Sequence, residues 1–186
     1  MRRFAIKNKL YKNRPAEAWL EYDEKTNSAV IVIYKNADLS LLPLIPEAFA
    51  KKGIYEVDSD WTLRFVRERV VPSSRQNIGE ILKAHGLRFY DEYALLFDSK
   101  GYCSQDDCYL EEETPETAYR ERALKYASLI ESARTAAGLT QAELAERSGI
   151  KQCNQSRIEN GKTMPSAEML ERIAGALGKQ VKISFT

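Results

Sequence analysis

The spacing of apolar and polar positions changes character along the chain. Short alternating or continuous apolar segments predict strands at residues 2–8, 16–22 and 28–34. After Pro43 the apolar spacing becomes helical, which predicts helices at 46–51, about 74–84 and 91–98. The first part of the chain is therefore expected to be a small α+β domain with strands first and helices after.

A boundary between two domains is predicted at EEETPET, residues 111–117. The residue before a proline disfavours helix, whereas Pro115 and Glu116 suit the first turn of a new one. A helix rich in Ala, Leu, Arg and Glu is expected from there to Ala137. We thus expect an α+β interaction domain at 1–112 and an all-α domain at 113–186.

The all-α domain carries clear helix start and stop signals. Thr140 is placed to cap a helix at 141–148, with Glu143 as its capping-box partner, and Gly149 suits the turn that follows. Two more helices are expected, from about 152 to 159 and, after a Ser166 cap, up to Gly178.

The tail QVKISF alternates apolar and polar residues and predicts a terminal strand. A single strand after a helical bundle lacks an obvious partner in its own domain. We expect Val181, Ile183 and Phe185 to form a dimer contact with the same strand of a second chain.

Composition and charge narrow the possible classes. With 44% hydrophobic and 30% charged residues, the chain is expected to fold rather than remain disordered. Residues 1–115 hold 17 Lys/Arg and 19 Asp/Glu, a net of 17 − 19 = −2, while 116–186 hold 11 and 8, a net of 11 − 8 = +3. A polyanion-binding surface is therefore expected in the C-terminal part.

The sequence contains no apolar run of signal-peptide or membrane-spanning length, so a cytoplasmic protein without membrane contact is expected. Three cysteines fit a reducing compartment. Cys103, Cys108 and the single His85 do not make the usual four-ligand zinc set, so no metal is expected.

Residues 141–162 combine the requirements of two helices that cross closely at a sharp turn. Leu144, Ile150 and Ile158 supply a core, Ala145 is small where the helices cross, and Gly149 can adopt a positive φ. This segment resembles the Xre/Cro-type helix-turn-helix family of phage repressors and antitoxins, over about residues 126–178.

The resemblance implies a reader of the DNA major groove that acts as a symmetric dimer. Gln152 would face base edges, with Gln141 supporting it and touching phosphate, and Cys153 and Ser156 would also contact bases. The remaining implied DNA-binding residues are Asn154, Gln155, Arg157, Asn160, Lys162 and Thr163.

Gln155 departs from the family pattern, which has Ile or Val at this position. Burying an unsatisfied amide would cost about 1–3 kcal/mol. Two alternatives stay open: the methylenes pack while the amide extends to the DNA face, or the helix is slightly rotated. In either case Asn154 and Gln155 would give a more polar DNA-facing surface.

Residues 1–110 contain no nucleotide-binding, dinucleotide-binding or hydrolase motif, so neither enzyme activity nor a cofactor is expected. The run SQDDCYLEEE at 104–113 is interpreted as a solvated acidic loop rather than a metal site.

A second resemblance concerns the first domain. FVRERVVPSSRQNIGEILKAHGL followed by YDEYALLFDSKGYCSQDD is similar to the small N-terminal subdomain of HipA-type kinases, and GIKQ with the closing strand resembles HipB-type antitoxins. Together they imply an autoregulating antitoxin and repressor that binds operator DNA as a homodimer and restrains a HipA-like toxin kinase. A ligand-sensing regulator and an enzyme domain tethered to DNA are the alternatives.

Overall fold

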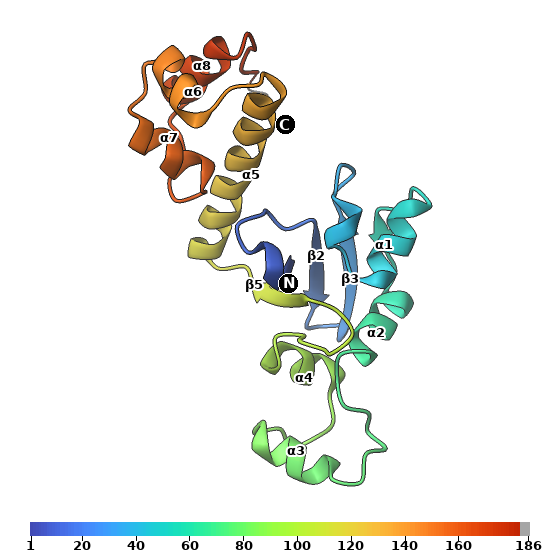
Figure 1. Cartoon of the computed structure of the whole chain (residues 1–186). Coiled ribbons are helices and arrows are strands. Elements are labelled where there is room, and N and C mark those ends of the chain that lie inside the picture. The colour runs from blue at the N-terminus through green and yellow to red at the C-terminus, as the bar shows by residue number, and fades with distance from the viewer. Residues whose placement is uncertain (183–186) are drawn as a thin grey trace. The chain divides into compact units, whose positions relative to one another are not determined.

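The computed structural model describes residues 1–182, which divide into two compact units (Figure 1). The first contains Met1–Lys12 and Ala16–Thr114, and the second begins at Pro115 and includes Asn13–Pro15. In the described part of the chain, none of the helices has the length and apolar character that a membrane span requires.

The first unit is built on a five-stranded antiparallel sheet with the order β4-β3-β2-β1-β5. The strands are β1 (Arg2–Asn8), β2 (Ala18–Asp23), β3 (Ser28–Ile33), β4 (Glu56–Val57) and β5 (Cys108–Glu112). The three predicted N-terminal strands are confirmed. Alternation along β3 buries Ala29, Ile31 and Ile33 on one face, as half-buried strands require.

Strand β5 corrects the interpretation of residues 104–113 as a solvated acidic loop. It pairs with β1, and Cys108 and Leu110 are buried in the sheet's core. The acidic side chains that follow form ion pairs with two arginines near the N-terminus: Glu112 lies 2.8 Å from Arg2, and Glu113 lies 3.2 Å from Arg3. The domain therefore does not place all its strands before its helices.

Helices α1 (Leu44–Lys51), α2 (Ser59–Arg67) and α4 (Glu92–Asp98) contribute Ile45, Phe65, Val66, Tyr93 and Leu96 to one core with the sheet. Figure 1 shows α1 and α2 beside β3. Helix α2 was not predicted, although Thr62, Phe65 and Val66 are buried at helical spacing and Asp58 caps its N-terminus. Two short 3-10 helices, η1 (Lys9–Tyr11) and η2 (Leu39–Leu41), complete the connections.

Helix α3 (Ile78–Ala84) contributes nothing to this core, and none of its residues is buried. Within the first unit it extends beyond α4, away from the sheet (Figure 1). The hydroxyl of Tyr90 donates to the carbonyl oxygen of Val71 at 2.8 Å, which joins the segment before α3 to the segment after it.

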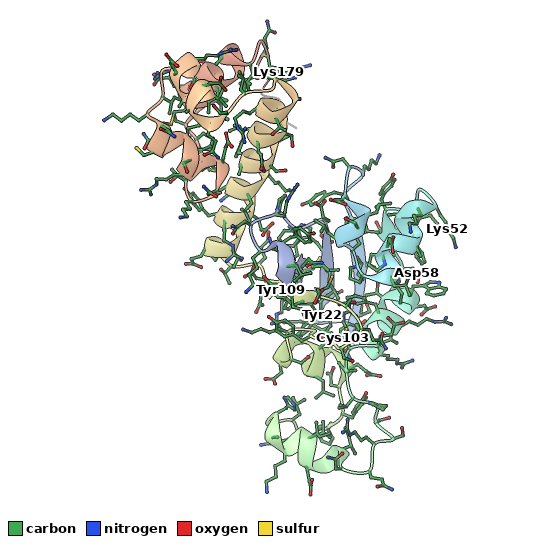
Figure 2. All side chains as sticks on the ribbon, in the orientation of Figure 1. Tyr22, Lys52, Asp58, Cys103, Tyr109 and Lys179 are labelled. Atoms are coloured by element: carbon green, nitrogen blue, oxygen red, sulfur yellow. The ribbon has the colours of Figure 1, made fainter. Side chains whose placement is uncertain are left out.

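The described part of the second unit contains four helices: α5 (Pro115–Ala136), α6 (Gln141–Ser148), α7 (Gln152–Glu159) and α8 (Ala167–Ala176). Their core is formed by Ile130, Leu144, Ile150, Ile158 and Ile173, with Met169 and Leu170 packed against it. Ser166 caps α8 by accepting from the N–H of Met169. Lys179, labelled in Figure 2, lies shortly after α8.

The predicted terminal strand falls mostly outside the described residues. Ile183 and Phe185 belong to that part of the chain. Val181 is described and lies in neither a helix nor a strand, with its side chain 39% exposed.

Candidate nucleic-acid interface

The turn between α6 and α7 is fixed by local signals at both of its ends. The hydroxyl of Thr140 accepts from the N–H of Glu143, and the Glu143 carboxylate accepts from the N–H of Thr140 at 2.7 Å, which confirms the predicted capping box. These two donors at Thr140 lower the pKa of Glu143. After α6, Gly149 adopts φ +64, and the N–H of Ile150 donates to the carbonyl of Ala145 at 2.9 Å.

The turn is also held from α8. Arg172 Nε donates to the carbonyl oxygen of Ser148 at 2.9 Å, and its Nη2 donates to that of Gly149. Cations suit the C-terminal end of a helix, where carbonyl groups lack partners within the helix. Arg172 therefore fixes the point at which the chain leaves α6 for α7.

The outer face of α7 carries most of the predicted DNA-binding side chains. Gln152, Cys153 and Arg157 are exposed, while Asn154 and Ser156 are half-buried. Within residues 1–182 no side chain caps the N-terminus of α7, so its first backbone amides are open to an external acceptor. The sequence prediction and the structure thus place these residues together on one helix.

The segment after α7 adds polar groups beside this face. Arg157 Nε donates to the hydroxyl of Thr163 at 3.3 Å, and Asn160 Nδ2 donates to the carbonyl of Ser156 at 2.7 Å. Lys162 is exposed. A hollow of about 170 Å³ lies here, lined by Asn154, Arg157, Ile158, Thr163 and Met169.

Charge on this side of the domain favours a polyanion. Lys151, Arg157 and Lys162 are exposed, and no ion pair involves any of them within residues 1–182. Unpaired cations near the N-terminal amides of a helix are a common arrangement for binding phosphate groups.

Gln155 corrects the prediction that it belongs to the exposed face. Its side chain is 0% exposed, so the amide does not reach the surface. Nε2 donates to Glu159 Oε1 at 2.9 Å, one helical turn further along α7. The amide oxygen is buried without a hydrogen-bond partner in the described structure.

Glu159 is the centre of a buried polar cluster that sequence reasoning missed. Its carboxylate also accepts from Arg134 Nε, at 2.9 and 3.0 Å, and from Gln141 Nε2 at 2.9 Å. Arg134 additionally donates to the carbonyl of Leu139 at 2.7 Å. The sequence contained a signal for this cluster. Gln155 and Glu159 are four residues apart on α7, so their side chains lie on the same side of the helix and can form a hydrogen bond.

This cluster changes the expected role of Gln141. The family resemblance implied support for Gln152, but within the described residues no hydrogen bond joins Gln141 to Gln152. The Gln141 amide is instead tied to Glu159, and its side chain is half-buried.

The first unit does not assemble a comparable polar site around its cysteines. Burial raises the pKa of the Cys108 thiol to about 12, and its sulfur lies 3.6 Å from the carbonyl of Leu41. Cys103 accepts from the Arg69 guanidinium, which also pairs with Asp106. Across residues 1–182 there is no group of three or more His, Cys, Asp or Glu side chains that could hold a metal.

Comparison with known proteins identifies the helical part of the chain. Residues 130–182 match the helix-turn-helix family HTH_3. An uncharacterized HTH-type transcriptional regulator of Methanothermobacter thermautotrophicus (strain Delta H) is 43% identical over 53 residues, which is 28% of this chain and 77% of that protein. No solved structure matches the chain. The matched range contains α6, its turn, α7 and α8, and through it the chain belongs to the HTH_3 helix-turn-helix family.

Proposed function

We propose that this protein is a sequence-specific DNA-binding transcriptional repressor that inserts α7 into the major groove. The observation that supports this most directly is the exposed face of α7, where Gln152, Cys153 and Arg157 project from a helix with an uncapped N-terminus. Recognition helices of this motif contact bases through their first residues. A relative that covers the same helices is named a transcriptional regulator.

The contacts divide by chemistry into those to bases and those to phosphates. The Gln152 amide can pair with both hydrogen-bonding groups of an adenine edge, and Cys153 and Ser156 lie near enough in sequence to reach adjacent bases. Arg157, Lys162 and the amides at the start of α7 contact phosphates. Asn160 and Thr163 orient this set through their bonds to Ser156 and Arg157.

A gel shift of the purified protein against its own upstream DNA tests the proposal. We expect binding at modest salt that exceeds binding to a scrambled duplex of the same length, and that weakens as salt rises. Equal binding to both duplexes would contradict sequence-specific recognition, and no binding would contradict DNA recognition itself.

The active form is proposed to be a homodimer that binds a palindromic operator, with the segment from Val181 through Ile183 and Phe185 as its contact. Deleting residues 180–186 should raise the concentration at which the protein dissociates in sedimentation velocity. A truncated protein that stays dimeric at the same low concentration would contradict this contact.

The first unit is proposed to bind a protein partner, a HipA-like toxin kinase, through the α3 surface. We define the α3 surface as Ile78, Ile81, Leu82, Leu87 and Phe89. Helices of seven residues are marginal in water without packing, yet no residue of α3 is buried and Phe89 is 82% exposed. Figure 2 shows α3 at the far end of the first unit, where His85, just after the helix, pairs with Asp98 of α4.

The charges around the α3 surface indicate what kind of partner it suits. Arg75, Lys83 and Arg88 are exposed and have no ion pair within residues 1–182, whereas Glu80 is the acidic residue of the helix. The surface therefore fits an apolar patch with an acidic rim. This arrangement supports the antitoxin hypothesis, in which the partner is encoded beside this gene.

A matched pair of variants tests the α3 surface. Leu82→Asp should reduce binding of the neighbouring gene's product at least tenfold, since it places a carboxylate in an apolar contact. Leu44→Asp, at a 73% exposed position on α1, is the control and should bind normally. Equal binding by both variants would contradict the α3 contact while leaving DNA recognition intact.

A hollow in the first unit favours small-molecule sensing as a second candidate function. It has a volume of about 320 Å³ and is lined by residues that include Arg2, Phe97, Lys100, Tyr102, Tyr109 and Glu112. The rings of Tyr102 and Tyr109 stack with their centroids 5.4 Å apart, and Lys100 in the lining suits a planar aromatic acid, since Arg2 is already paired with Glu112. Thermal shift of the full chain with aromatic carboxylates tests this. A shift that Tyr102→Ala removes would favour sensing, and no shift would contradict it.

A further inference from the structure

The buried side of α7 contains two polar residues, Gln155 and Glu159, and Gln155 stands where the family pattern has an apolar side chain. Gln155 is completely buried, and its amide nitrogen donates to Glu159 Oε1 at 2.9 Å. The orientation of this amide is chemically determined, because an ionised carboxylate only accepts hydrogen bonds. The amide oxygen is consequently left without a partner in the described structure.

This arrangement gains the hydrogen bond to Glu159 but leaves the oxygen of the same amide unpaired. An unpaired buried carbonyl oxygen loses its hydrogen bond to water and gains none in return. An apolar side chain of similar volume would remove both this hydrogen bond and the unpaired oxygen, and the two effects on stability offset each other. The presence of Gln155 therefore needs an explanation other than packing.

The geometry of the hydrogen bonds around Glu159 explains why a polar residue lies at position 155. Donors from three helices converge on the Glu159 carboxylate: Arg134 from α5, Gln141 from α6 and Gln155 from α7. Hydrogen bonds weaken steeply when they are misaligned, whereas apolar contacts are non-directional. A small rotation of α7 about its axis, which an apolar contact would tolerate, would misalign the bonds from Arg134 and Gln141 to Glu159.

We propose that Gln155 is a specificity-determining residue that acts without touching DNA. Its hydrogen bond to Glu159, made within α7, holds the carboxylate where Arg134 of α5 and Gln141 of α6 donate to it, and those two bonds fix the rotation of α7 relative to α5 and α6. That rotation decides where Gln152, three residues earlier, and Ser156, the next residue, meet the base edges. The inference rests on the proposed recognition of DNA by α7. In it, Gln155 gives α7 a defined orientation at the cost of an unpaired buried oxygen.

The first test compares Gln155→Met with Ile158→Val in the full chain. Methionine keeps an unbranched apolar stem and removes both the donor and the unpaired oxygen. Ile158 is 1% exposed on the same helix, so its shortening disturbs packing without touching the polar cluster. For each protein, the unfolding midpoint in urea and the dissociation constants for its own upstream duplex and a scrambled duplex are measured at one salt concentration.

The two variants are expected to differ both in their unfolding midpoint and in their preference for the upstream duplex. Gln155→Met should keep the wild-type midpoint or exceed it, bind the scrambled duplex normally, and lose about tenfold of its preference for the upstream duplex. Ile158→Val should have a lower midpoint and an unchanged preference. An unchanged preference in Gln155→Met, or a loss on both duplexes that follows a lower midpoint, would overturn the proposal.

A measurement without DNA separates this inference from the proposed function. If the wild-type protein does not discriminate between the duplexes, the proposed function fails. Hydrogen exchange of the α7 amides in the free protein then decides the inference. Faster exchange in Gln155→Met at an equal or higher midpoint supports the orienting role, and unchanged exchange overturns it.

Discussion

Arg172 Nε of α8 donates to the carbonyl oxygen of Ser148 at the end of α6, at 2.9 Å. The bond places a guanidinium directly beside the turn that leads into α7. The positive φ of Gly149 favours glycine at this turn, and a Cβ there would lie 2.7 Å from Arg172 Nη2, so the guanidinium would have to shift.

Gly149→Ala should therefore destabilise the protein by about 1–2 kcal/mol, because Gly149 has φ +64 and L-residues are strained there. Displacement of Arg172 would add to this cost. Gly175→Ala is the matched control: this glycine lies inside α8 with nothing within 4 Å of the added Cβ, and the change should stabilise by up to about 1 kcal/mol. Urea unfolding measures both, and equal effects would contradict the role of the turn.

Glu159→Gln should lower stability by about 3–5 kcal/mol, because it leaves the Arg134 guanidinium without its charge partner. The Glu159 side chain is 2% exposed and that of Arg134 is 15% exposed, so water compensates little. Glu171→Gln, at an exposed position on α8, is the control and should change stability by less than about 0.5 kcal/mol. A small loss in Glu159→Gln would show that the cluster is weak.

Gln152→Ala should cost about 1–3 kcal/mol of binding at its own base pair and leave nonspecific binding nearly unchanged. Lys162→Ala should instead weaken binding to all sequences and reduce the salt dependence by about one charge. Titrations of matched and substituted duplexes at several salt concentrations measure both effects. Uniform loss in Gln152→Ala would mean that this residue only supports the fold.

The capping box should make the free energy of unfolding depend on pH in the acid range. The pKa of Glu143 is lowered by the N–H and hydroxyl of Thr140, so the folded protein holds this proton less tightly than the unfolded chain. Its contribution is complete above the unfolded pKa, near 4.3 for Glu, and is lost as pH falls through the lower folded value. The unfolding midpoint of Glu143→Ala should therefore fall less steeply with acid than that of the wild type.

Alkylation tests the proposal that Cys153 on α7 faces DNA. Cys153 is exposed and should react first with iodoacetamide, whereas Cys108 is buried and its pKa of about 12 keeps it protonated at pH values near 8. Bound operator DNA should slow the reaction at Cys153, as followed by mass spectrometry. An unaltered rate at saturating DNA would place Cys153 outside the interface.

The sequence was most informative where the determining interactions are local. The capping box at Thr140, the positive φ of Gly149 and the alternation of β3 depend on residues a few positions apart. Strand β5 was missed because its partner, β1, lies about a hundred residues earlier in the chain. Its acidic side chains resemble a solvated loop until Arg2 and Arg3 are placed beside them.

The amino-acid sequence by itself determined the helix-turn-helix frame and the identity of the exposed residues on α7, because helical periodicity and caps are short-range properties. It also identified Gln155 as unusual without locating its amide. Only the tertiary structure decided that this amide faces inward to Glu159, where Arg134 and Gln141 also converge. The physical reason is that the position of a buried hydrogen bond depends on how three helices pack, and no local pattern encodes that packing.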